Sequence, residues 1–166
     1  TRGISLIELI VVVGIFTILM SAIISSVISF YRANTSSLEQ GYQIDSARRG
    51  VEFLVRDLRE ATYGDNGAYP LLSIASTSIT FYSDTDKDAV VERIRYSLLG
   101  TELYRHVLDS SGTPPSYSGA GATSTVSLYV RNAEEAAPVF RYYDSQGIEV
   151  TNYAEVGEVR SVVIDL

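Results

Sequence analysis

Residues 3–31 read GISLIELIVVVGIFTILMSAIISSVISFY, and Glu8 is the only charged side chain in this stretch. At about 1.5 Å per residue, residues 4–30 would form a helix roughly 40 Å long. About 20 apolar residues are enough to cross the hydrocarbon core of a membrane. The apolar region of a secretory signal peptide is shorter, about 7–15 residues. The stretch therefore predicts a helix that spans a membrane and stays in the protein.

Glu8 is the feature of this helix that needs an explanation. A charged side chain costs roughly 2.5–3.5 kcal/mol at the centre of a bilayer, and Glu8 lies near one end, where the cost is smaller. We expect the carboxylate to have a partner, and a free amine on a neighbouring chain is the best candidate. The alternative is a plain single-span anchor in which Glu8 reaches the headgroups by snorkelling.

The residues around Glu8 resemble a processing signal. Residues 1–3, Thr-Arg-Gly, place a cation and then glycine before the apolar run, and residues 3–9 read GISLIEL. This pattern resembles the class III signal of type IV prepilins and pseudopilins. The resemblance implies that prepilin peptidase cuts after Gly3, so that residues 1–3 are a leader remnant. It also implies that Ile4 becomes the N-methylated first residue, and that its amine pairs with Glu8 of an adjacent subunit.

The sequence departs from the common family pattern at three points. Many members begin the mature chain with Phe, whereas this one would begin with Ile4. Many major pilins carry a proline in the second half of the apolar helix, but the first proline here is Pro70. Many also close a C-terminal loop with a disulfide, which this chain cannot form because it has no cysteine.

The helix is predicted to continue past the apolar run and to change character. Five apolar residues recur at helical steps of four and three: Ala47, Val51, Leu54, Leu58 and Ala61. Charged residues, Asp57 among them, are assigned to the other faces. Tyr63-Gly64 is a suitable stop because glycine tolerates the left-handed conformation that ends many helices. We therefore divide the chain into residues 1–3, the spanning helix 4–30, an amphipathic continuation 31–63 and a β-rich head 64–166.

Residues 64–166 carry strand and turn signals. Alternating or apolar runs of strand length predict strands at 78–83, 92–98, 102–108, 125–131, 139–143 and 159–166. Hairpin or tight turns are predicted at 99–101 and 144–147, and a Ser-, Gly- and Pro-rich loop at 109–124. One long helix packed on a mainly antiparallel sheet is an α+β fold. It is also the architecture that the resemblance to pilins implies.

Three segments of the chain resemble a subgroup of that family. Residues 48–61, 81–88 and 140–147 are similar to W-type minor pilins and to J-type minor pseudopilins of type II secretion. This likeness implies a non-enzymatic subunit near the tip of a filament that helps to initiate assembly. Its expected partners are other pilin or pseudopilin subunits, prepilin peptidase and the inner membrane. The head would lie outside the cytoplasm, first on a single-pass precursor and then in a periplasmic or cell-surface filament.

One short acidic segment could hold a metal ion. Asp84, Asp86 and Asp88 have the one-three-five spacing of a calcium loop, and Glu92 could add an oxygen. The rest of an EF-hand is missing, because Ala89 stands where that loop needs glycine. A solvated acidic turn between two strands is therefore the preferred interpretation, with calcium as the alternative. The resemblance itself implies no cofactor.

Composition narrows the remaining function classes. The net charge is −7 and the isoelectric point about 4.7, which argues against a general nucleic-acid-binding surface. His106 is the only histidine, and no nucleophile at a suitable spacing accompanies it. We therefore expect no enzyme. The alternative to a filament subunit is a single-span anchored periplasmic or surface binding protein with a β-rich, sensor-like domain.

Overall fold

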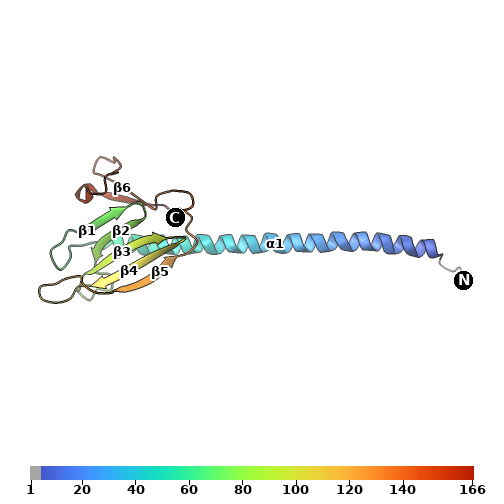
Figure 1. Ribbon diagram of the computed structural model, residues 1–166, viewed down its shortest axis with the longest axis horizontal. Helices are drawn as coiled ribbons and strands as arrows, with labels where there is room; N and C mark the ends of the chain where they lie inside the picture. The colour runs from blue at the N-terminus through green and yellow to red at the C-terminus, as the bar shows by residue number, and fades with distance from the viewer. Residues whose placement is uncertain (1–4) are drawn as a thin grey trace. The chain divides into compact units, whose positions relative to one another are not determined.

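The computed structural model describes residues 5–166, and within residues 33–40 it describes the backbone alone. The chain divides into two units, with the boundary between Tyr42 and Gln43. Helix α1, Leu6–Arg59, begins in the first unit and ends in the second (Figure 1).

The second unit contains a five-stranded antiparallel sheet whose strands follow one another in chain order (Figure 1). Its strands are β1 (Leu71–Ala75), β2 (Ser78–Ser83), β3 (Glu92–Leu99), β4 (Glu102–Asp109) and β5 (Ala122–Ser127). A separate two-stranded antiparallel sheet is formed by β6 (Phe140–Tyr143) and β7 (Ser161–Ile164). A 3-10 turn, η1 (Val156–Glu158), precedes β7.

Alternation along the strands explains why the large sheet has one buried face. In β3, Ile94 and Tyr96 are fully buried, whereas Arg95 between them is exposed. Successive side chains of a strand point to opposite faces, so this order gives one apolar and one polar face. The β3–β4 hairpin closes through Gly100, whose φ of 63° is a conformation that glycine adopts without strain.

The core of the second unit lies between the last turns of α1, the apolar face of the sheet and the C-terminal segment. Leu54 supplies the fully buried apolar side chain of the helix, and the buried residues Val139, Phe140 and Tyr142 close the core from β6 and its preceding loop. The Tyr142 hydroxyl donates toward two carbonyls of the β1–β2 hairpin, at 2.9 and 3.1 Å. The two sheets thereby share one core.

The helix approaches β5 closely at Gly50. A Cβ placed there would lie 2.7 Å from Cβ of Ser127, which is nearer than side chains tolerate. One turn earlier, the backbone N–H of Leu128 donates to Oγ of Ser46 at 2.9 Å. Small residues on this face of the helix therefore set its distance from the edge of the sheet.

The predicted α+β class is confirmed, with corrections to the end of the helix and to the bounds of β5 and β7. The strand predicted at 159–166 is shorter, Ser161–Ile164, because a 3-10 turn precedes it. The helix ends at Arg59 instead of Tyr63, because the next residues join the sheet. Ala61 bridges to Ser83, and the Thr62 N–H donates to the carbonyl of Tyr82. Backbone pairing to the sheet here replaces the last helical turn.

The predicted loop at 109–124 and strand at 125–131 are also wrong in their bounds. β5 begins at Ala122 and ends at Ser127, because residues 122–125 pair with β4 as a polar edge strand. It stops where Leu128 bonds to the helix and Tyr129 adopts a φ of 63°. β1 was not predicted, although its sequence LLSIA is of strand length.

Candidate functional site

The apolar part of α1, Leu6–Arg32, is long and apolar enough to cross a membrane. Every residue in it is exposed, and large contiguous apolar surfaces mark contacts with membranes or other proteins. By length and composition the segment can serve as a membrane anchor or as a signal sequence. Of these two forms, the anchor is compatible with the expected single-pass attachment.

Glu8 lies in the first turn of α1, where Ser5 caps the helix. The Glu8 N–H donates to the Ser5 carbonyl at 3.1 Å and to Ser5 Oγ at 3.3 Å. A serine followed three residues later by a glutamate is the sequence of a capping box. An acidic side chain in a first turn also interacts favourably with the helix dipole, typically by 0.3–1 kcal/mol. The helix cap and the helix dipole therefore account for part of the preference for an acid at this position.

The proposed processing residues cannot be compared with the structure in the same way. Gly3 and Ile4 lie outside the described residues. Among the residues whose side chains are described, none hydrogen-bonds or ion-pairs with the Glu8 carboxylate. The predicted cleavage after Gly3 and the predicted pairing of Ile4 with Glu8 therefore stay predictions.

The structure brings the predicted acidic residues together. Asp84, Asp86 and Asp88, which we call the acidic turn, join Glu92 at the start of β3. One carboxylate oxygen from each of the four lies within 4.8 Å of the others. Oxygen ligands from carboxylates suit a hard cation such as calcium, so the grouping is chemically able to hold one.

The acidic turn is nevertheless closed by its own hydrogen bonds. Oδ1 of Asp84 accepts the N–H of Lys87 at 2.7 Å, and Oδ1 of Asp88 accepts the N–H of Val90 at 2.8 Å. Such aspartate-to-backbone bonds are typical of turns that need no metal. Glu92 differs because it is buried, and burial raises its pKa despite the bonds that it accepts from Thr85. The solvated acidic turn and the calcium site therefore both stay predictions.

Next to this turn lies a buried ion pair that the sequence did not reveal. Asp57 is fully buried, and its Oδ2 accepts hydrogen bonds from Nε of Arg105 at 2.6 Å and from the hydroxyl of Tyr96 at 2.7 Å. Arg56 approaches Oδ1 at 3.4 Å. Burial and the charge of Asp57 raise the pKa of Tyr96 far above its usual range, so this hydroxyl remains a donor. Burial opposes the charged form of Arg105, but the hydrogen bond and charge of Asp57 raise its pKa overall.

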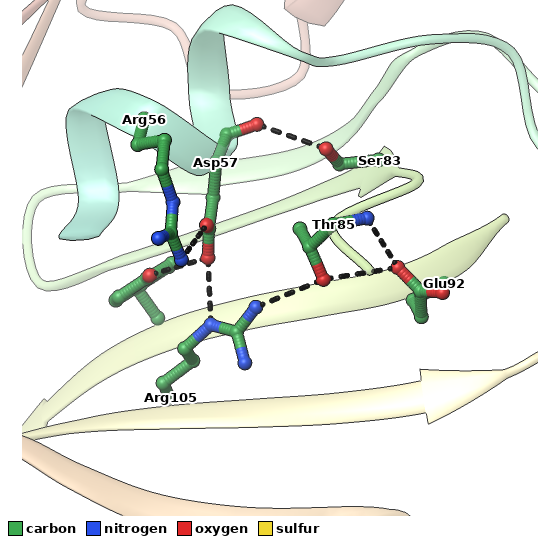
Figure 2. A network of polar contacts seen from close by, with 7 residues as sticks. Arg56, Asp57, Ser83, Thr85, Glu92 and Arg105 are labelled. Atoms are coloured by element: carbon green, nitrogen blue, oxygen red, sulfur yellow. Dashed lines mark hydrogen bonds and ion pairs between the residues drawn. The ribbon is translucent and has the colours of Figure 1, made fainter. Parts of the chain in front are cut away.

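The network continues from this pair to the acidic turn. Nη2 of Arg105 donates to Oγ1 of Thr85 at 3.3 Å, and Thr85 donates from both its N–H and its hydroxyl to Oε2 of Glu92. The main-chain carbonyl of Asp57 accepts the hydroxyl of Ser83 at 3.0 Å. Figure 2 shows how these groups connect α1 with strands β2, β3 and β4. The ion pair and hydrogen bonds of Asp57 thus connect the helix to the sheet.

The assignment of Asp57 to a face of the helix other than the apolar one is wrong, because the side chain is fully buried. The signal that could have found it is its spacing, because Leu54, Asp57 and Ala61 follow the same helical stripe. A charged residue at a core position needs an oppositely charged partner, since burying an unpaired charge is costly. The partner could not be named from the sequence, because Arg105 is 48 residues away.

His106 contacts the loop that precedes β5. Its Nε2 lies 2.8 Å from the carbonyl of Ala120, and Gly121 passes so close that a Cβ there would collide with the ring. The imidazole thus supports the loop that leads into β5.

Comparison with known proteins gives no independent identification. No protein-family model matches the chain, and no characterised protein matches it significantly.

Proposed function

We propose that this chain is a non-enzymatic minor subunit of a type IV filament, either a pilus or a type II secretion pseudopilus. The observation that supports the proposal most directly is the position of Glu8. It is the only acid in a fully exposed apolar helical segment, and it follows Gly3 at the spacing of a class III prepilin signal. The α+β layout of helix and antiparallel sheet agrees with such a subunit.

The chemistry of assembly would follow from two charges. Cleavage after Gly3 would leave an ammonium on Ile4, next to the apolar segment. When helices stack with a stagger, the Glu8 carboxylate of one subunit can meet the amine of the next. Breaking a buried ion pair by removing one partner costs about 3–5 kcal/mol, which is roughly a hundredfold or more in an association constant. Such a pair would select the staggered arrangement.

The local capping role of Glu8 allows a sharp test. Glu8→Gln keeps a residue type that completes a capping box but removes the charge. We expect Glu8→Gln to be lost from filaments while the head stays folded. Ser5→Ala is the matched control, because it weakens the cap by about 1 kcal/mol and leaves the carboxylate in place. Normal incorporation of Glu8→Gln, measured by immunoblotting of sheared filaments, would refute the pairing.

Processing is tested at the native N-terminus. Mass spectrometry of protein from its own cells should find a chain that begins at N-methylated Ile4, and Gly3→Leu should block that cleavage. A mature protein that retains the residues before Ile4 would overturn the filament proposal.

The Ser5–Glu8 cap favours a second candidate function, a single-span anchored periplasmic or surface binding protein. In such a protein the cap and the helix dipole would account for Glu8 without a second subunit. Uncut protein in membranes, together with normal behaviour of Glu8→Gln, is the outcome that this candidate requires.

A further inference from the structure

The outward face of the five-stranded sheet carries a groove of about 670 Å³, which we call the sheet-face groove. Its polar lining includes Thr80, Arg93, Arg95, Ser97, Tyr104 and His106. They come from the three central strands β2, β3 and β4. The groove lies within the second unit, on the face of the sheet away from the core residues Ile94 and Tyr96.

The charge of the groove is opposite to that of the protein. The chain has 20 acidic residues against 13 lysines and arginines, yet the groove is lined by two arginines and no acid. Arg93 and Arg95 are two residues apart on one face of β3, so their Cβ atoms are about 7 Å apart. Strand pairing places His106 directly opposite Arg95. An acidic protein thus presents a compact cationic site on its sheet.

The two arginines have little to neutralise them. Arg95 is exposed and has no hydrogen bond or ion pair within the described part of the chain. Arg93 has no ion pair with any of the residues whose side chains are described, and its guanidinium carbon lies 5.9 Å from the centre of the Tyr117 ring. The nearby acid Glu102 is engaged, since it accepts the Tyr104 hydroxyl at 2.7 Å and that of Thr125 at 3.4 Å. Guanidinium groups in this state are suited to bidentate binding of a carboxylate.

The floor of the groove limits the class of ligand. β3 and β4 are interior strands, paired on both sides, so their backbone N–H and C=O groups are already used. An extended peptide gains most from the free backbone of a sheet edge, which this face does not offer. Side-chain hydroxyls line the groove instead: that of Ser97 is partly exposed, and Thr80 is largely buried beside Arg95. They fit a ligand that carries its own hydroxyls as well as carboxylates.

We propose that the sheet-face groove binds an acidic polysaccharide, that is, a carbohydrate chain bearing carboxylates. The arginines would hold the carboxylates, the hydroxyls would bond to the sugar hydroxyls, and the Tyr104 ring would pack against a sugar ring. Leu72 and Leu99 line the same groove and add apolar surface. This function is independent of the filament role, because it uses residues of the second unit alone.

The test uses the full chain in a non-ionic detergent and titration calorimetry with three probes. Oligogalacturonate supplies carboxylates and hydroxyls, poly-glutamate supplies carboxylates on a peptide, and maltooligosaccharide supplies hydroxyls without charge. We expect saturable binding of oligogalacturonate that weakens with added salt, because part of the attraction is between exposed charges. Poly-glutamate and maltooligosaccharide should bind at least tenfold more weakly.

Variants assign the binding to the groove. Arg95→Gln should weaken oligogalacturonate binding about tenfold or more, since a hydrogen bond to a charged group is lost. Arg93→Gln should act in the same direction. Arg131→Gln is the matched control, because Arg131 is an exposed arginine of the same unit, paired with Glu134 outside the groove. Far-UV circular dichroism checks that each variant is folded.

Four results would overturn the proposal. They are no binding of oligogalacturonate, equal binding of maltooligosaccharide, equal or tighter binding of poly-glutamate, and an equal effect of the Arg95→Gln and Arg131→Gln substitutions. The third result would identify an acidic protein as the partner instead. None of them bears on cleavage after Gly3 or on Glu8, so the two proposals can fail separately.

Discussion

Replacing Arg105 by methionine removes the closest cationic partner of the fully buried Asp57 carboxylate. Nε of Arg105 lies 2.6 Å from Oδ2, and the Arg105 side chain is only 17% exposed, so little water can take its place. Removing one partner of a buried pair costs about 3–5 kcal/mol. Arg56 and the Tyr96 hydroxyl remain near Asp57, so we take the lower end, about 3 kcal/mol.

The change is measured by urea unfolding of the full chain in detergent, followed by tyrosine fluorescence. For a unit the size of residues 43–166, a loss of about 3 kcal/mol corresponds to a fall in Tm of roughly 10 °C. Arg131→Met serves as the control, because its ion pair is exposed and such pairs contribute about 0–1 kcal/mol.

A double-mutant cycle separates the ion pair from simple loss of packing. Asp57→Leu alone leaves Arg105 without its anion, whereas Asp57→Leu with Arg105→Met removes both charges. Replacing a buried pair by apolar residues is often nearly neutral, so the double variant should be more stable than the sum of the single effects predicts, by about 2 kcal/mol. Additive effects, or an Arg105→Met variant as stable as the wild type, would refute the reasoning.

Three further predictions concern the same unit. Gly50→Ala should destabilise the protein by about 1 kcal/mol in urea unfolding, because its Cβ would crowd Ser127, whereas Gly41→Ala has open space and should be neutral or stabilising. Burial raises the pKa of Glu92 in the folded state above its ordinary value of 4.5. Between the unfolded-state and the folded-state pKa, the folded state therefore binds more protons than the unfolded state does. Stability should therefore fall as pH rises from about 4.5 through the folded-state pKa, and Glu92→Gln should flatten that slope in a pH series of urea midpoints. EDTA should leave Tm unchanged if hydrogen bonds alone close the acidic turn, and a drop of several degrees, restored by calcium, would show a resident ion.

Local periodicity was enough to predict most of the elements. The apolar stripe through Leu54 and Leu58 placed the second half of the helix, and alternation placed β2, β3 and β4 within one residue of their bounds. β5 was misplaced because its sequence ATSTVS, mostly exposed, lacks the apolar alternation by which the other strands were predicted. Its position depends on pairing with β4, which has no local signature.

The candidate sites also differ in whether they depend on neighbouring residues or on residues far apart in the chain. The spacing of Asp84, Asp86 and Asp88 is local, and the sequence located that turn. The contribution of Glu92 required the strand to bring its carboxylate beside the turn. The pairing of Asp57 with Arg105 joins a helix to a strand far along the chain, and residue types alone gave no reason to connect them.

The long apolar helix, the unusual position of Glu8 in it and the switch to β structure after Gly64 were all predictable from the residues alone. These features depend on the spacing of neighbouring side chains, because the periodicity of a helix or a strand determines which neighbours share a face. The burial of Asp57 against Arg105, and the groove that Arg93, Arg95 and His106 share, became visible only in the folded unit. Burial of a charge and the composition of a sheet face depend on which strands pair, and pairing is a property of the whole folded unit.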